Sequence, residues 1–144
     1  MADSNGEESN MTDGLERISL SGVPSAKGAY CQVVRAGDFL FVSGQGPIDS
    51  VSNEFSLGDI GQQTTLVLQN IREILKECKA SMSDVVKCSV FLETASDFAQ
   101  MDTAYRAFFK DLTPARTTVQ AGLVEPGMKV EIDCIAYRPR GRSL

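Results

Sequence analysis

The longest periodic stretch of the chain runs from Leu57 to Lys79, and it constrains the fold more than any other feature. Its apolar residues recur with the roughly 3.6-residue period of an amphipathic helix that buries one stripe. They are Ile60, Val67, Leu68, Ile71, Ile74, Leu75 and Cys78. Gly58 and Gly61 weaken the predicted start of this helix.

Alternating or β-branched runs separated by turn residues predict six strands. These runs cover residues 17–21, 30–35, 39–43, 84–93, 116–124 and 128–137. A second helix is predicted from Ser96 as N-cap to a stop at Pro114, with an aromatic face that belongs to the core. The order β-β-β-α-β-α-β-β indicates an α+β sandwich, in which both helices pack on one face of a mixed sheet. We expect residues 17–144 to form a single domain.

The second face of this sheet has no helix to cover it, yet it is apolar. Phe39 and Phe41 point opposite to Leu40 and Val42, and Tyr137 lies on the face opposite Ile132. Such a face needs a partner, most simply another copy of the chain, so we predict a homo-oligomer.

Charge and composition exclude several classes of function. Residues 1–16 carry the whole net charge of −5, which predicts a flexible acidic tail in front of a neutral domain. A neutral domain lacks the basic surface of a nucleic-acid binder. No apolar run approaches the length of a membrane span, which favours the cytoplasm, with an organelle left open. The chain has no histidine and its four cysteines form no CxxC pair, so we predict no metal site.

On spacing alone, Arg116 is either a surface arginine at a strand end or a ligand for an anion. It follows the stiff Pro114-Ala115 pair at the entry to a β-branched run, and its guanidinium can grip a carboxylate with two hydrogen bonds. If the last two strands pair as a hairpin about Pro126, Glu131 lies near Ala121, roughly 15 Å from Arg116. A site that uses Arg116 and Glu131 together would then draw them from different subunits.

Four segments together resemble the reactive intermediate deaminases, also called the Rid or YjgF family. They are Gly28-Ala-Tyr-Cys-Gln32, Phe41-Val-Ser-Gly-Gln45, Pro114-Ala-Arg-Thr117 and Val130-Glu-Ile-Asp133-Cys-Ile-Ala136. The similarity covers about residues 17–138 and implies a chorismate-mutase-like fold and a homotrimer with sites between subunits. It also implies a cofactor-independent hydrolase that converts 2-imino acids, such as 2-iminobutanoate and 2-iminopropanoate, to 2-oxo acids and ammonia.

The resemblance also assigns roles to residues of this chain. The carboxylate-binding arginine falls on Arg116, the water-positioning glutamate on Glu131 and the pocket tyrosine on Tyr30. Loop contacts to the substrate fall on Ser43, Gly44, Gln45 and Gly46. Two substrate-binding positions depart from the family, since Thr118 replaces a cysteine and Asp102 replaces an asparagine. A backbone carbonyl survives the first change. The negative charge of Asp102 near the pocket would repel a substrate carboxylate, so this residue either shifts the preference toward imines with another charge pattern or simply faces solvent.

Two other functions stay open on the sequence. Asp102 and Thr118 leave room for a trimer that senses ligands or binds partners without turnover. The endoribonuclease activity sometimes ascribed to the family is disfavoured, because the chain has no histidine and its domain is neutral.

Overall fold

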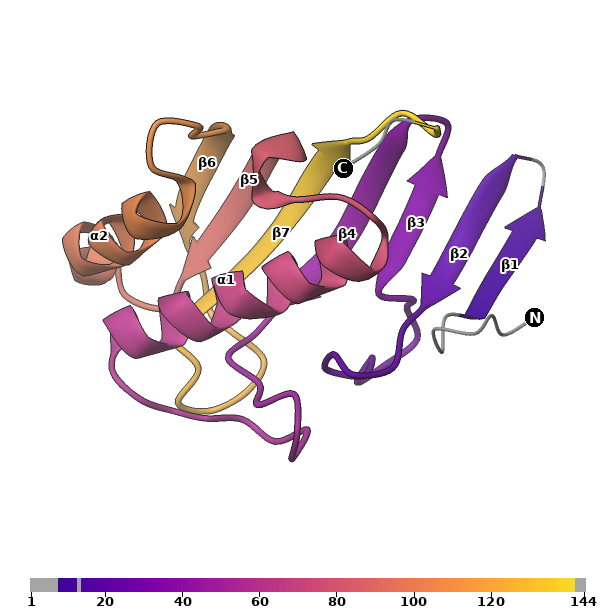
Figure 1. Cartoon of the computed structure of the whole chain (residues 1–144). Helices are drawn as coiled ribbons and strands as arrows, with labels where there is room; N and C mark the ends of the chain where they lie inside the picture. Colours follow the sequence, from indigo (N-terminus) through magenta and orange to yellow (C-terminus); the bar gives the residue numbers. More distant parts are fainter. Residues whose placement is uncertain (1–7, 13, 142–144) are drawn as a thin grey trace.

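A mixed sheet with two helices on one face makes up the described part of the chain, residues 8–12 and 14–141, in this computed structural model (Figure 1). Its strands are β1 (Glu8–Thr12), β2 (Leu15–Ser19), β3 (Val33–Ala36), β4 (Phe39–Gln45), β5 (Val85–Leu92), β6 (Ala115–Gln120) and β7 (Val130–Tyr137). They lie in the order β1-β2-β3-β4-β7-β5-β6, and β5 with β6 is the parallel pair among otherwise antiparallel neighbours. The predicted α+β sandwich is confirmed.

The long helix α1 (Ile60–Glu77) begins with a capping box, so the predicted weakness of its start is not observed. The Asp59 carboxylate accepts a hydrogen bond from the Gln62 backbone N–H, and the Gln62 side chain accepts one from the Asp59 N–H. These reciprocal bonds satisfy two backbone donors that would otherwise be unpaired, which offsets the glycines nearby.

The second helix, α2 (Phe98–Phe109), follows a short 3-10 turn, η2 (Ala95–Asp97). Ser96 therefore lies inside that turn, and the prediction that it caps the helix is wrong. A similar 3-10 turn, η1 (Met82–Asp84), precedes β5. The apolar face of α2 is only partly core: Met101, Tyr105 and Phe109 are buried, whereas Phe98 is 44% exposed. Leu112 was within the predicted helix but lies beyond the end of α2, and it is 63% exposed.

The two faces of the sheet follow from strand register. Val42, Cys134 and Cys88 are successive partners across β4, β7 and β5, and all three are buried beneath the helices. Their odd-numbered neighbours face away from both helices. Phe39, Phe41 and Tyr137 are each at least 40% exposed on that side, so the predicted uncovered apolar face is confirmed. All four cysteines are free thiols.

Two elements differ from the sequence predictions. Glu8–Thr12 forms β1, antiparallel to β2, where a flexible tail was predicted; the rest of that prediction falls partly on residues outside the described ones. The expected hairpin of the last two strands is wrong. Strand β5 lies between β6 and β7, because the crossover through α2 sets β6 parallel to β5 at the sheet edge. Within the described residues, no helix is long and apolar enough to cross a membrane.

Candidate functional site

The predicted site residues divide into two groups on opposite faces of the sheet. Arg116 is the partner of buried Cys88 across β6 and β5, so its side chain lies on the face that the helices cover. Glu131 is the partner of Phe91 and alternates with buried Val130 and Ile132, so it lies on the uncovered face. Within one chain, therefore, the structure does not bring Arg116 and Glu131 together.

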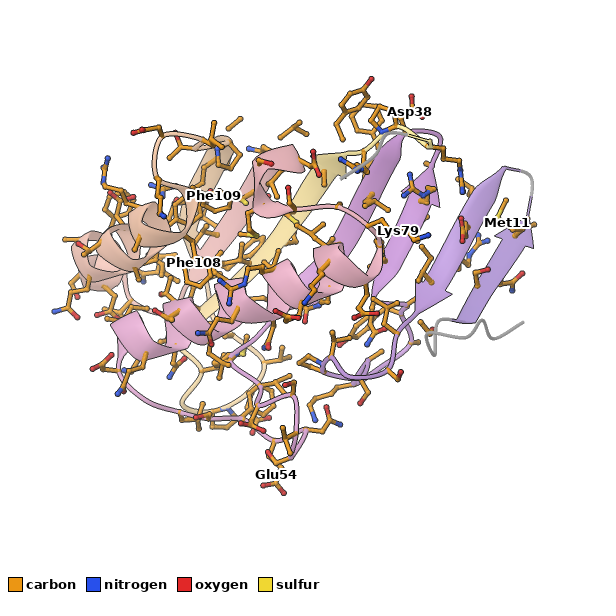
Figure 2. The ribbon with its side chains drawn as sticks, viewed as in Figure 1. Met11, Asp38, Glu54, Lys79, Phe108 and Phe109 are labelled. Atoms are coloured by element: carbon orange, nitrogen blue, oxygen red, sulfur yellow. The ribbon has the colours of Figure 1, made fainter. Side chains whose placement is uncertain are left out.

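The first group lines a cavity of about 530 Å³. Tyr30 enters from the loop before β3, Ser43 to Gln45 from the end of β4, and Glu131 from β7. The β4–β7 register shifts between Val42 and Gln45, as at a β-bulge, and pairing resumes at Gln45 with Ile132. The loop between β4 and α1, with Glu54 at its outer end in Figure 2, adds Ile48 and Phe55 to the wall.

Gly44 is glycine because the Glu131 carboxylate occupies the place of a side chain. A Cβ at Gly44 would lie 2.6 Å from Glu131 Oε2 and 2.9 Å from its Cδ. The backbone of β4 and the carboxylate of β7 are therefore in close approach. The next glycine, Gly46, is crowded in the same way by Met128, whose Cε would lie 2.9 Å from an added Cβ.

The Glu131 carboxyl is half-buried among groups that disfavour its charge. Burial, and then the neighbouring carboxylate of Asp133, raise the pKa of Glu131 above its ordinary value. A carboxyl with a raised pKa exchanges protons closer to neutral pH, which suits a group that accepts and returns a proton.

Local hydrogen bonds fix the rest of this cavity. The Tyr30 hydroxyl accepts a hydrogen bond from the Lys27 backbone N–H at 3.0 Å, although the tyrosine is 47% exposed. Ser43 Oγ donates to the Cys31 carbonyl at 2.7 Å, which leaves its lone pairs for an incoming donor. Gln45 is buried and donates to the Ser43 carbonyl at 3.0 Å. Tyr30 precedes the strand instead of lying in it, contrary to the predicted strand over residues 30–35.

The second group surrounds Arg116 at the corner between β6 and α2. Arg116 Nη1 donates to Asp102 Oδ1 at 2.8 Å, and its guanidinium lies 4.6 Å from the centre of the Tyr105 ring and 5.4 Å from that of Phe98. Arg106 reaches the other Asp102 oxygen at 3.4 Å. The Arg116 side chain is only 19% exposed, and it lines a cavity of about 330 Å³ with Asp102, Tyr105 and Pro114. The Arg116 guanidinium is thus a partly desolvated cation whose position is fixed by Asp102 and two aromatic rings.

Asp102 contacts Arg116, so of the two alternatives left open by the sequence, the one in which Asp102 simply faces solvent does not hold. The hydrogen bond from Arg116 lowers the pKa of Asp102, and the Arg116 and Arg106 charges act in the same direction. The site therefore holds one carboxylate and two guanidinium groups. Thr118, two residues beyond Arg116, contributes a buried hydroxyl oxygen that has no hydrogen-bond partner among the described residues.

Sequence reasoning missed several residues of both groups. Lys27 and Glu125 line the Glu131 cavity, and the Lys27 ammonium lies 5.7 Å from the centre of the Phe55 ring. Lys27 directly precedes the Gly28-Ala-Tyr motif, but a loop residue gives no periodic signal. Tyr105 could have been found, because it lies three residues after Asp102 and so shares its helix face.

The class that the structure defines is an α+β fold in which an arginine-lined cavity and a glutamate-lined cavity lie on opposite faces of one sheet. Comparison with known families makes this specific. The profile of the family described as Endoribonuclease L-PSP matches residues 21–138. The chain belongs to this family, which includes the Rid and YjgF proteins.

Individual relatives agree with that assignment. A RutC family protein of Pyrococcus abyssi is 40% identical over 85% of this chain and 97% of its own length. The rat 2-iminobutanoate/2-iminopropanoate deaminase is 34% identical over 84% of this chain and 88% of its own. Among solved structures, the Rid family protein YyfA of Yersinia pestis superposes with a TM-score of 0.81 at 32% identity, covering 85% of this chain and 98% of that one.

Proposed function

We propose that the protein hydrolyses 2-imino acids, such as 2-iminobutanoate and 2-iminopropanoate, to 2-oxo acids and ammonia at sites shared between subunits of a homotrimer. One observation carries the proposal: Arg116 and Glu131 lie on opposite faces of the same sheet. A substrate that touches both must then lie between two copies of the chain. The exposed apolar face provides the surface on which copies can meet.

Arg116 would hold the substrate carboxylate. Asp102 takes one N–H of its guanidinium, and the remaining donors are available for a charge-assisted hydrogen-bond pair, each bond worth about 1.5–3 kcal/mol. Thr118 offers an unpaired hydroxyl on the same side of β6. Tyr30, Ser43 and the backbone of Gly44 to Gly46, supplied by the neighbouring subunit, would then enclose the imine end of the substrate.

Glu131 would act on the water. It orients a water molecule and accepts a proton as the water oxygen bonds to the imine carbon, which gives a carbinolamine. Return of that proton to nitrogen completes the carbinolamine. Glu131 then takes the hydroxyl proton of the carbinolamine and passes it to the amino group, so that the C–N bond breaks, ammonia leaves and the C–O bond becomes the carbonyl of the 2-oxo acid. The overall balance is imine plus water to ketone plus ammonia, with no electrons transferred. Positioning and proton transfer suffice for so reactive a substrate.

The test is release of 2-oxo acid and ammonia from an imino acid generated in place by an amino acid oxidase. We expect Arg116→Ala to lower kcat/KM by about 100-fold or more, since the carboxylate anchor contributes several kcal/mol. Arg72→Ala is the matched control, because Arg72 is a half-exposed arginine that stacks on Phe108 of α2, outside both cavities. It should retain wild-type turnover.

Three results would contradict the proposal. No acceleration over buffer by the wild-type protein would reject the enzyme. If 2-oxobutanoate binds in an Arg116-dependent way but no imine is hydrolysed, a ligand-sensing trimer would be the better description. RNA cleavage that survives repurification and is lost in Arg116→Ala would favour the nuclease activity in the family's name.

A further inference from the structure

Asp102 presents to Arg116 the same chemical group as the substrate. Its carboxylate lies 2.8 Å from Arg116 Nη1, within the range of a charge-assisted hydrogen bond. The contact is made inside the 330 Å³ cavity where the guanidinium is accessible. Because Arg116 already binds the Asp102 carboxylate, a second carboxylate gains a different binding free energy there than it would at a free arginine.

The pair is held on several sides. Tyr105 and Phe98 lie beside the guanidinium, at 4.6 and 5.4 Å from its central carbon. Asp102 and Tyr105 come from one turn of α2, so the helix itself keeps the carboxylate against β6. The Asp102 and Arg116 side chains are 28% and 19% exposed, so water screens their charges only in part.

We propose that Asp102 is an internal competitor that sets the affinity of the site for carboxylate ligands, acting through Arg116. This inference rests on the proposed function, because it takes Arg116 to be the substrate's carboxylate anchor. Asp102 weakens capture of the substrate and of the 2-oxo acid product alike, by occupying one donor and by placing a negative charge next to the incoming one. It is a positioning and affinity-setting residue, since it acts through Arg116.

The other charged groups nearby do not cancel this effect. Arg106 pairs with the second oxygen of Asp102 at 3.4 Å, but its side chain is 73% exposed and is therefore well screened. The Asp102 carboxyl stays ionised at working pH, because the Arg116 hydrogen bond lowers its pKa. Both features leave a full negative charge beside the anchor.

Asp102→Asn tests the inference, because the amide can still accept the Arg116 hydrogen bond while the charge is lost. The measurement is calorimetric binding of 2-oxobutanoate to the full-length protein. We expect Asp102→Asn to bind about tenfold more tightly than wild type. In turnover, KM should fall by a similar factor with little change in kcat. Asp102→Ala should also bind more tightly, by less, since it frees the guanidinium to move.

Two controls isolate the charge. Asp111→Asn removes an equal charge from an exposed residue after α2 and should leave affinity unchanged. The neutral amide of 2-oxobutanoate should bind Asp102→Asn and wild type equally, because it carries no charge to repel.

Equal 2-oxobutanoate affinity in wild type and Asp102→Asn, with binding still lost in Arg116→Ala, would overturn the role of Asp102 and leave the proposed function standing. Weaker binding in Asp102→Asn would also overturn it, and would make Asp102 a support for Arg116 instead. Binding that is insensitive to Arg116→Ala would overturn this inference and the proposed function together.

Discussion

At the scale of single residues, Gly44 links the backbone of β4 to the position of Glu131. Gly44→Ala would put a methyl group 2.6 Å from Glu131 Oε2, so the carboxylate must move. We expect at least a tenfold loss of kcat, with only a small change in the free energy of unfolding, because the carboxylate is the end of a flexible side chain.

Gly37→Ala is the matched control. Gly37 has φ +59° and nothing within 4 Å of an added Cβ, so strain should cost about 1 kcal/mol without affecting turnover. Urea melts and the coupled assay measure both, and equal loss of activity in the two variants would contradict the argument.

The raised pKa of Glu131 makes a second residue-scale prediction, on stability. Burial and Asp133 raise the folded-state pKa above the unfolded value, so the folded state binds more protons between the two values. The free energy of unfolding therefore falls as pH rises through that window, and this contribution is fully present only below the unfolded pKa of about 4.5. Glu131→Gln has no such group. We expect its urea midpoint, relative to that of wild type, to rise from pH 4 to pH 7; a constant difference would show that Glu131 is not perturbed.

At the scale of elements, periodicity and alternation were enough to predict both helices and the faces of β4 and β7. The apolar stripe from Ile60 to Cys78 has the 3.6-residue period of a helix, and the apolar residues on both faces of β4 and β7 indicate strands that are covered on both sides. Strand pairing was not predictable in the same way. Residues 116–124 and 128–137 looked like a hairpin because a Pro-Gly turn separates them, but the α2 crossover places β6 beside β5. The Glu8–Thr12 strand is polar, and it forms because β2 offers it an unpaired edge, which composition does not reveal.

The same distinction holds for the site. Arg116, Glu131 and Tyr30 were found as residue types within motifs, and the structure places each in a cavity. Which residues meet depends on register: a shift of one position along β6 or β7 would exchange the faces. The Asp102–Arg116 ion pair was missed for a different reason: it depends on how α2 packs against β6, which the sequence alone did not show.

At the scale of the whole molecule, a site that takes Arg116 from one subunit and Glu131 from another predicts that two inactive variants recover activity when they are mixed. A site within a single chain would not recover activity in this way. Arg116→Ala and Glu131→Gln should each be inactive as pure proteins. Mixed by co-refolding in equal amounts, they should regain about a quarter of wild-type activity, because a site at a given interface is intact when an Arg116 from one variant faces a Glu131 from the other. In the proposed trimer, randomly assorted subunits meet both conditions at about one interface in four. Light scattering measures the oligomeric state of the mixture, and the coupled assay measures the recovered rate. Mixing Arg116→Ala with the double variant is the control and should recover nothing, since no intact Arg116 is present. Failure of the first mixture, with mixed oligomers demonstrated, would mean that Arg116 and Glu131 do not share a site across subunits.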